Sequence, residues 1–452
     1  MGQGLVMKVL TTVLVAALMA TSVSGQVVNE HYKFTLDDPE VFDQFGASVA
    51  VTYDYIVVGS VHKRIQGLKV GAVYVYDAVS REELAVLSPP GDQEFIEFGS
   101  SVSVFGNRVV VGAWAYDGAF EESGVAYVYD AVSGQLLLTL EPFDPAAFHG
   151  FGYSVAISDS IILVGAYRDS QVTDASGAVY VFDAETGAQL RKVVADDAMA
   201  NDQYGIDVDI DGNLAAIGSN YVDQDGIWNV GSLYVYDIQD WFLTSRCFVD
   251  DAQGSEQIGS DVDLCGQYVV TGSQTSDVVG VDSGAAFVFD ALTGQQIHKL
   301  IPSDTAPLDA FGRAVALNNS VVVAGSILDD DLGFQSGSAY LFDLATGQQI
   351  MKLLASDGDR QDLLGDQVGL SETVVLVSSP THSESGAVYL YSLPYLDCPA
   401  DINYDGSLTP ADFTAWVAAF NNGALGCDQN GDGACTPSDF TAWIANYNLG
   451  CG

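Results

Sequence analysis

The feature that most constrains the fold is a sequence repeat that recurs seven times along the chain. Each copy begins with a large apolar residue followed by glycine, and successive glycines are 53, 53, 53, 54, 53 and 53 residues apart. The pairs are Phe45-Gly46, Phe98-Gly99, Phe151-Gly152, Tyr204-Gly205, Ile258-Gly259, Phe311-Gly312 and Leu364-Gly365. Two further columns keep the same phase: Gly59, Gly112, Gly165, Gly218, Gly272, Gly325 and Ser378, and Gly71, Gly124, Gly177, Gly231, Gly284, Gly337 and Gly386. Columns that stay in phase over all seven copies indicate a repeat architecture in which each unit packs against its neighbours.

Each copy predicts four short β-strands. In the first copy the first three strands are expected at Ala47–Val51, Tyr55–Val58 and Ala72–Tyr76. An example of the fourth strand is Gln135–Leu140 in the second copy. The third strand is apolar on both faces, so both faces must be covered. An Asp-Ala-x-Ser/Thr-Gly hairpin turn follows it, for example at 130–134. Four antiparallel strands, repeated seven times and covered on both faces, predict an all-β fold, a seven-bladed β-propeller.

The two ends of the repeat array indicate how the ring closes. The seventh copy ends after Gly386–Tyr391 and lacks a fourth strand. The segment Tyr32–Leu36 precedes the first copy and is similar to fourth strands such as Leu137–Leu140. We therefore expect this N-terminal strand to complete the seventh blade.

The first twenty-five residues predict a signal peptide. Lys8 precedes the mostly apolar run Val9–Ala20, and small residues follow before Gln26. No later run reaches the roughly 18 apolar residues that a membrane-spanning helix needs. We therefore expect a bacterial protein that is secreted or held at the cell surface and has no transmembrane segment.

The charge balance is strongly acidic. The chain has 60 Asp and Glu residues against 15 Lys and Arg residues, which gives a formal net charge of −45. Such a chain repels phosphate and has no basic stripe, which excludes nucleic acid as a partner. Acidity of this size favours divalent cations, a saline exterior or a role in solubility.

The repeat columns resemble the FG-GAP repeats of integrin α-chain propellers and their bacterial relatives, over residues 30 to 394. This resemblance implies an extracellular recognition or adhesion module at residues 26–394. Calcium-binding blades of that family carry an Asp-rich loop between the first two strands, whereas here this connection is a short turn such as Phe105–Asn107. Blade calcium is therefore not expected, and we interpret the acidic segment Asp207–Gly212 as a strand followed by a turn.

After Pro394 the sequence contains two copies of a calcium-loop pattern, spaced 27 residues apart. Each copy places oxygen ligands at loop positions 1, 3, 5, 7 and 12 and glycine at position 6, the pattern of an EF-hand loop. The expected ligands are Asp401, Asn403, Asp405, the Ser407 carbonyl and Asp412 in one loop, and Asp428, Asn430, Asp432, the Ala434 carbonyl and Asp439 in the other. We predict that this module binds two Ca²⁺ ions.

The C-terminal module, residues 395–452, resembles the cysteine-bearing dockerin-type tails of secreted planctomycete proteins. The resemblance rests on Asp at loop position 12 followed directly by a helix, and on the flanking Cys398, Cys427 and Cys451. It implies a docking or surface-attachment tag that binds a protein partner. Pro410-Ala411 and Pro437-Ser438 occupy the positions that contact the partner in classical dockerins, so a classical cohesin partner is in doubt. The aromatic residues at helical spacing are expected mostly in its core: Phe413, Trp416, Phe440 and Trp443.

Cysteine usage predicts disulfides, because an exported chain meets an oxidising environment. Cys398, Cys427, Cys435 and Cys451 lie close together in sequence and are expected to pair among themselves. The dockerin resemblance, in which the two termini lie close together, favours Cys398–Cys451 and leaves Cys427–Cys435. A third bridge between Cys247 and Cys265 is left open.

The sequence offers two candidate sites on the propeller and no catalytic residues. Asp207, Asp209, Asp261 and Asp263 lie two and four residues after the column glycines of the fourth and fifth copies, where they could share a proton, hold a cation or pair with backbone amides. Aromatic residues in the loops between second and third strands form the candidate ligand rim: Trp114, Tyr116, Phe120, Tyr167, Tyr221 and Trp228. Aromatic residues mixed with Asp and Asn suit a glycan or a protein ligand, or else anchor their own loops.

Two functions follow from these features. The favoured one is a non-catalytic recognition or adhesion propeller, tethered through its calcium-dependent tail. The alternative is a polysaccharide-active enzyme, a glycoside hydrolase or lyase, with the four aspartates as its site. The absence of an acid–base pair outside the repeat columns favours the first.

Overall fold

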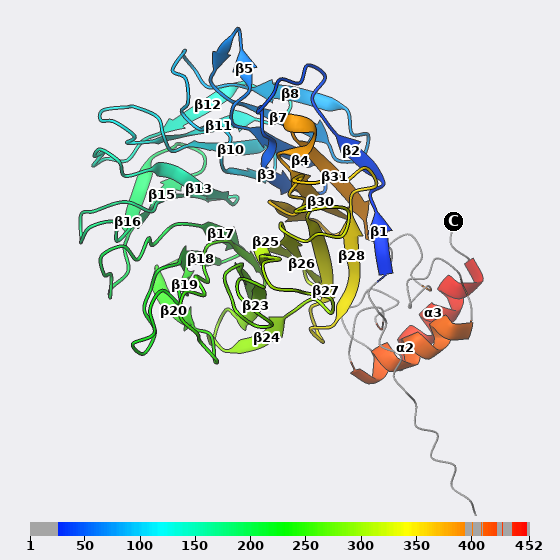
Figure 1. Ribbon diagram of the computed structural model, residues 1–452. Helices are drawn as coiled ribbons and strands as arrows, with labels where there is room; N and C mark the ends of the chain where they lie inside the picture. The colour runs from blue at the N-terminus through cyan, green and yellow to red at the C-terminus, as the bar shows by residue number, and fades with distance from the viewer. Residues whose placement is uncertain are drawn as a thin grey trace, which may run out of the picture.

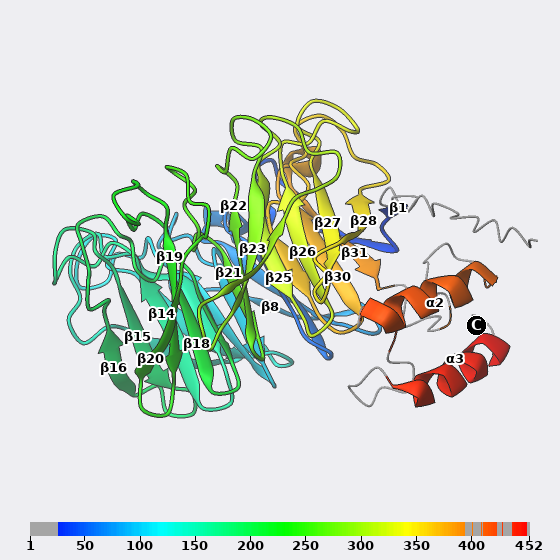
Figure 2. The same ribbon diagram turned by 90° about the horizontal axis from the view of Figure 1, so that it is seen from below.

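The computed structural model describes residues 26–393, 400, 408, 410–422, 427 and 436–449. Seven antiparallel sheets are arranged around a common axis, with one strand of each sheet near the axis (Figures 1 and 2). The predicted seven-bladed propeller with four-stranded blades is therefore confirmed. The signal peptide and most of the calcium loops lie outside the described residues.

The blades follow one another along the chain, and the first six run from their innermost to their outermost strand. Blade one contains β3 (Phe45–Val51), β4 (Tyr55–Ser60), β7 (Ala72–Asp77) and β8 (Glu83–Leu87). Blade two contains β9 (Val102–Phe105), β10 (Arg108–Ala113), β11 (Val125–Asp130) and β12 (Leu136–Leu140). Blade three contains β13 (Phe151–Ile157), β14 (Ile161–Ala166), β15 (Ala178–Asp183) and β16 (Gln189–Val193). Blades four and five contain β17 (Val208–Asp211), β18 (Leu214–Ser219), β19 (Ser232–Asp237) and β20 (Phe242–Cys247); and β21 (Val262–Cys265), β22 (Tyr268–Ser273), β23 (Ala285–Asp290) and β24 (Gln296–Leu300).

Blades six and seven contain β25 (Phe311–Leu317), β26 (Val321–Ser326), β27 (Ser338–Asp343) and β28 (Gln349–Leu354); and β29 (Val368–Leu370), β30 (Val374–Ser379), β31 (Ala387–Ser392) and β2 (Tyr32–Phe34). The remaining elements are β1 (Gln26–Asn29), the small hairpin of β5 (Arg64–Ile65) and β6 (Leu68–Lys69), the 3₁₀ turn η1 (His382–Glu384), and two helices of the C-terminal module, α2 (Pro410–Asn422) and α3 (Pro437–Leu449).

The N-terminal segment closes the ring, as the sequence predicts. Strand β2 pairs antiparallel with β31, so that Tyr32 lies opposite Leu390 and Phe34 opposite Val388. The structure adds a second contact, because β1 pairs in parallel with β28 and becomes a fifth strand of blade six. One continuous segment therefore joins the last two blades (Figure 1).

The repeat columns mark the places where neighbouring blades meet. The large residue of each Phe-Gly pair is buried, and in six of the seven pairs its backbone forms a parallel bridge to the preceding blade, as between Phe151 and Gly124. Six of the seven members of the second column are glycine, and a β carbon on Gly112 would lie 2.0 Å from the carbonyl oxygen of Gly152. The seventh member is Ser378. The conserved spacing thus reflects backbone contact between blades.

Candidate functional site

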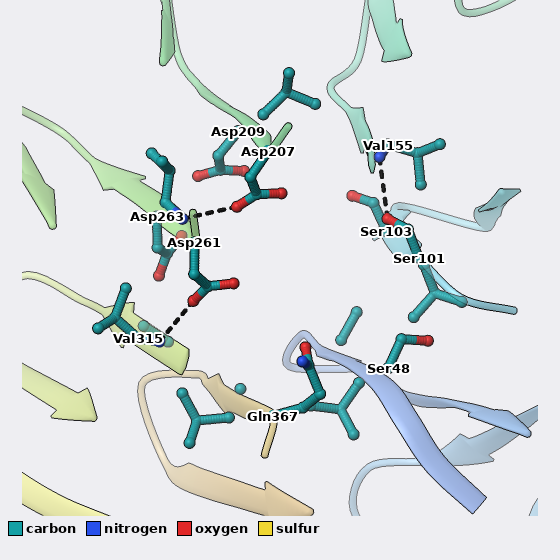
Figure 3. Close-up of a pocket in the computed structure, with 18 of the residues that line it drawn as sticks. Ser48, Ser101, Ser103, Val155, Asp207, Asp209, Asp261, Asp263, Val315 and Gln367 are labelled. Carbon is teal, nitrogen blue, oxygen red and sulfur yellow. Dashed lines mark hydrogen bonds between the residues drawn. The ribbon is translucent and has the colours of Figure 1, made fainter. Parts of the chain in front are cut away.

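The innermost strands of the seven blades surround a central cavity of about 500 Å³. Asp207, Asp209, Asp261 and Asp263 all line this cavity, so the structure brings the predicted acidic residues together. Figure 3 shows them on one side of the cavity, facing serine side chains on the other side.

Each of these carboxylates accepts a hydrogen bond from the backbone of the next blade. The donor–acceptor pairs are Val262 N–H to Asp207 (2.7 Å), Leu264 N–H to Asp209 (2.8 Å), Val315 N–H to Asp261 (2.6 Å) and Leu317 N–H to Asp263 (2.6 Å). The side chains therefore satisfy the free edge of the neighbouring inner strand, which has no ladder partner on that side. This pairing with backbone amides is one of the three roles that the sequence left open.

Burial determines the protonation of this group. It raises the pKa of Asp261 to about 6. Burial also raises the pKa of Asp263, and the neighbouring charge of Asp209 raises it further. The charges of Asp209 and Asp263 act on each other, so these two carboxyl groups titrate together. In the part of the chain that the structure describes, no three His, Cys, Asp or Glu side chains are placed to hold a metal ion.

Serine residues perform the same structural task in blade two. The hydroxyl oxygen of Ser101 accepts a hydrogen bond from Val155 N–H at 3.0 Å, and that of Ser103 accepts one from Ile157 N–H at 3.3 Å. A neutral hydroxyl and a carboxylate are thus alternative solutions to one requirement, the satisfaction of an inner-strand N–H group.

One end of the cavity carries a ring of side chains that the sequence analysis did not single out. The residue after each Phe-Gly glycine belongs to this ring, which we call the loop-end ring: Ala47, Ser100, Tyr153, Ile206, Ser260, Arg313 and Asp366. The loops between second and third strands begin at the same end, because Phe151 at the start of β13 pairs with Ala166 at the end of β14. Arg313 donates a hydrogen bond from Nε to Asp366 at 3.2 Å. The sequence held one signal for this ring: Tyr153, Arg313 and Asp366 are larger or charged residues at a repeat position that smaller residues fill in the other copies.

Two of the predicted rim aromatics pack against this ring. The ring centroid of Tyr153 lies 4.3 Å from that of Tyr167 and 6.0 Å from that of Trp114. The Arg168 guanidinium lies 4.8 Å from the Tyr167 centroid and 5.9 Å from that of Trp114. Together these four side chains form one aromatic wall.

The other predicted rim residues do not join this wall as a group. Tyr116 packs against the core of blade two, while Phe120 and Trp228 are exposed on their own loops. Tyr221 is half-buried and close enough for its charge to affect Tyr153. The structure therefore selects Trp114 and Tyr167 from the predicted set.

A second group of carboxylates, of which Asp329 and Asp169 are buried, lies at the outer strands in what we call the rim networks. In blade six the Lys352 ammonium contacts Asp304 at 2.9 Å, Asp329 at 2.8 Å and Asp331 at 2.5 Å, and Tyr340 donates a hydrogen bond to Asp329. Blade three repeats this arrangement around Lys192, which contacts Asp144 at 3.0 Å and Asp169 at 2.7 Å. Lysine ammonium groups therefore neutralise the buried carboxylates of these blades.

The described part of the C-terminal module contains the residues at loop position 12. Asp412 and Asp439 are both fully buried in the first turns of α2 and α3. The other predicted calcium ligands, Asp401, Asn403, Asp405, Ser407, Asp428, Asn430, Asp432 and Ala434, lie outside the described residues. Trp416 and Trp443 are buried as expected, but Phe413 and Phe440 are 41% and 38% exposed.

The predicted bridge between Cys247 and Cys265 is not formed, and both cysteines are free. Cys247 ends β20, the outermost strand of blade four, whereas Cys265 ends β21, the innermost strand of blade five. Their strands therefore lie at different distances from the axis. Cys427 is disulfide-bonded, and Cys398, Cys435 and Cys451 lie outside the described residues.

Comparison with known families supports the assignment of the repeats. The family model described as "FG-GAP repeat" matches residues 28–76, 82–129, 138–182, 188–236, 295–342 and 348–391. The first three strands of the fifth blade lie between two of these matches, and this blade has the same four-stranded order as the others. A search of curated proteins found no match. None of the helices in the described ranges is both long and apolar enough to cross a membrane.

Proposed function

Because the chain belongs to the FG-GAP repeat family, we propose that it is a secreted, non-catalytic recognition or adhesion protein whose propeller binds an extracellular ligand. This proposal rests on the hydrogen bonds that the four cavity carboxylates make. Each one accepts a hydrogen bond from the backbone of the next blade. A general acid or nucleophile must instead direct its reacting oxygen toward a substrate.

The alternative function, a polysaccharide-active enzyme, has one observation in its favour. The pKa of Asp261 is raised by burial to about 6, a value suited to a general acid near neutral pH. Its carboxylate oxygen nevertheless lies 2.6 Å from Val315 N–H, which gives the same group a structural role.

One assay separates the two functions. The full-length protein is incubated with algal and plant polysaccharides, and both retention on the polysaccharide and release of reducing or unsaturated sugars are measured. We expect retention without release. Sugar release that is lost in the Asp261→Asn variant would overturn the non-catalytic proposal and establish the enzyme.

The same proposal includes attachment through a dockerin-like tail that binds two Ca²⁺ ions. Its support is that Asp412 and Asp439, equivalent positions of the two loops, are both fully buried, as ligand carboxylates are. Calcium would be held by these residues together with the predicted oxygen ligands of each loop. Its charge would offset the repulsion among three carboxylates per loop, and the tail should fold more tightly when it is bound.

Calorimetric titration of the full chain with CaCl₂ tests this part. We expect two bound ions, and one ion fewer in each of the variants Asp405→Ala and Asp432→Ala. A chelator should lower only one melting transition and leave that of the propeller unchanged. No binding below millimolar calcium, or a chelator that melts the propeller, would contradict the proposal.

A further inference from the structure

The residues of the loop-end ring are not explained by folding alone. Four of its members are small or aliphatic, whereas Tyr153, Arg313 and Asp366 project larger polar groups at the same repeat position. The ion pair between Arg313 and Asp366 is partly exposed, with side-chain exposures of 37% and 19%. Ion pairs that water can reach contribute little to stability. Their place at the end of a cavity therefore indicates a ligand site.

The aromatic wall provides one side of this site. Trp114 and Tyr153 both line the cavity, and Tyr153 is fixed by its contact with Tyr167 at 4.3 Å between ring centroids. Arg168 covers the outer side of Tyr167. A rigid aromatic surface of this kind suits the flat apolar face of a pyranose ring, and the surface is preorganised before the ligand binds.

Hydrogen-bond donors and acceptors complete the ring. The Arg313 guanidinium supplies hydrogen-bond donors, and the carboxylates of Asp366 and Asp207 supply acceptors in the same cavity. Ser100 also lines the cavity. Sugar hydroxyls both donate and accept hydrogen bonds, so they match this mixed set of donors and acceptors.

Charge decides which sugar fits. Arg313 is neutralised by Asp366, and the four aspartates lie further along the same cavity, so the site has no net positive charge to bind a uronate or sulfate group. A cationic amino sugar would have to approach the Arg313 guanidinium, which lines the cavity. The charge of Arg313 acts on the Tyr153 hydroxyl, where it opposes the burial that raises the pKa of Tyr153. These groups favour an uncharged ligand.

The shape of the cavity limits how a ligand enters. Its volume of about 500 Å³ lies within the usual range of small-ligand pockets, and inner strands of all seven blades enclose it. A polymer cannot lie across such a cavity, but its end can enter. We propose that the loop-end ring binds the terminal residues of a neutral oligosaccharide, an inference that rests on the proposed recognition function.

Isothermal titration of the full-length protein tests this inference with defined probes. The neutral probes are the tetraoses of cellulose, mannan, xylan and laminarin, and the charged probes are tetragalacturonate and the chitosan tetramer. We expect at least one neutral tetraose to bind more tightly than both charged probes. Tyr153→Ala and Arg313→Ala should each weaken that binding by about tenfold or more. The control is Tyr53→Ala, because Tyr53 is 73% exposed in the turn at the opposite end of its blade.

The outcomes separate this inference from the function on which it rests. Tighter binding of a charged probe, or an unchanged affinity in a folded Tyr153→Ala variant, would overturn the ligand class or the site while leaving recognition intact. Retention on a polysaccharide with no tetraose binding would likewise refute the chain-end site alone. Release of sugar from any probe would overturn the proposed function itself.

Discussion

Buried carboxylates are stabilised in opposite ways in the rim networks and in the central cavity. Burial raises the pKa of Asp329, but the hydrogen bond and charge of Lys352 outweigh it and hold that pKa below its usual value. Burial also raises the pKa of Asp263, and there the nearby charge of Asp209 adds to the shift. The partner therefore decides whether a buried aspartate prefers to be charged, and these two regions should respond oppositely to mutation and to pH.

The largest effect should come from removing a rim cation. Lys352→Met leaves Asp304, Asp329 and Asp331 without their shared ammonium group, and breaking a buried ion pair costs about 3–5 kcal/mol. Denaturant unfolding of the full chain measures this loss. In the control Arg64→Met, the broken pair with Glu40 is exposed, so the change should stay within about 1 kcal/mol. Equal effects in the two variants would remove the distinction between rim and surface charges.

A smaller effect is expected when a cavity carboxyl group is removed. Asp263→Ala leaves Leu317 N–H without its acceptor, which should lower the free energy of unfolding by about 1–3 kcal/mol at pH 5. Asp263→Asn retains an oxygen acceptor and should lose much less. The comparison fails if the alanine and asparagine variants unfold at the same denaturant concentration.

The smallest effect is expected on the serine side of the cavity. Ser103→Ala removes one neutral hydrogen bond of 3.3 Å, from Ile157 N–H, which should lower the free energy of unfolding by about 0.5–1.5 kcal/mol. Because no charge is removed, this loss should be the same at pH 5 and pH 8. A loss that changes with pH would indicate that the serine and carboxylate sides are electrostatically coupled.

The repeat columns made the fold predictable, because they record contacts between blades that every copy must make. The strand Tyr32–Leu36 was predictable in the same way, since a blade with a missing strand requires a donor. The pairing of β1 with β28 was not predictable, because Gln26–Asn29 belongs to no column. The sequence predicted that the four cavity aspartates lie together. It could not predict their hydrogen bonds, because these depend on how one blade is offset from the next.

The loop-end ring was missed for a related reason. Columns are recognised by what their members share, whereas Tyr153, Arg313 and Asp366 are notable because they differ from their equivalents in other blades. The expected bridge between Cys247 and Cys265 failed because adjacency of two blades does not bring an outermost strand near an innermost one. The repeat positions therefore predicted the strands of each blade better than they predicted which side chains of neighbouring blades meet.

The central claim is that the cavity aspartates are structural acceptors held despite their charge, and the pH dependence of thermal unfolding tests it most directly. In the folded protein the pKa of Asp261 is about 6, above the value of about 3.9 expected in the unfolded chain. The folded state therefore binds protons first as the pH falls from 8 to 5, and its stability should rise over that range. In the rim network of blade six the pKa of Asp329 is lowered, so the contribution of this carboxylate should be lost only below about pH 4.

The deciding measurement compares the melting temperature of the wild type with that of the double variant Asp209→Asn/Asp263→Asn at pH 5 and pH 8. Asparagine retains an acceptor for the neighbouring backbone but carries no charge. The double variant should therefore melt at a higher temperature than the wild type at pH 8, and the difference should shrink at pH 5. A double variant that melts lower than the wild type at pH 8 would show that ionised aspartates stabilise the propeller, and would contradict this account.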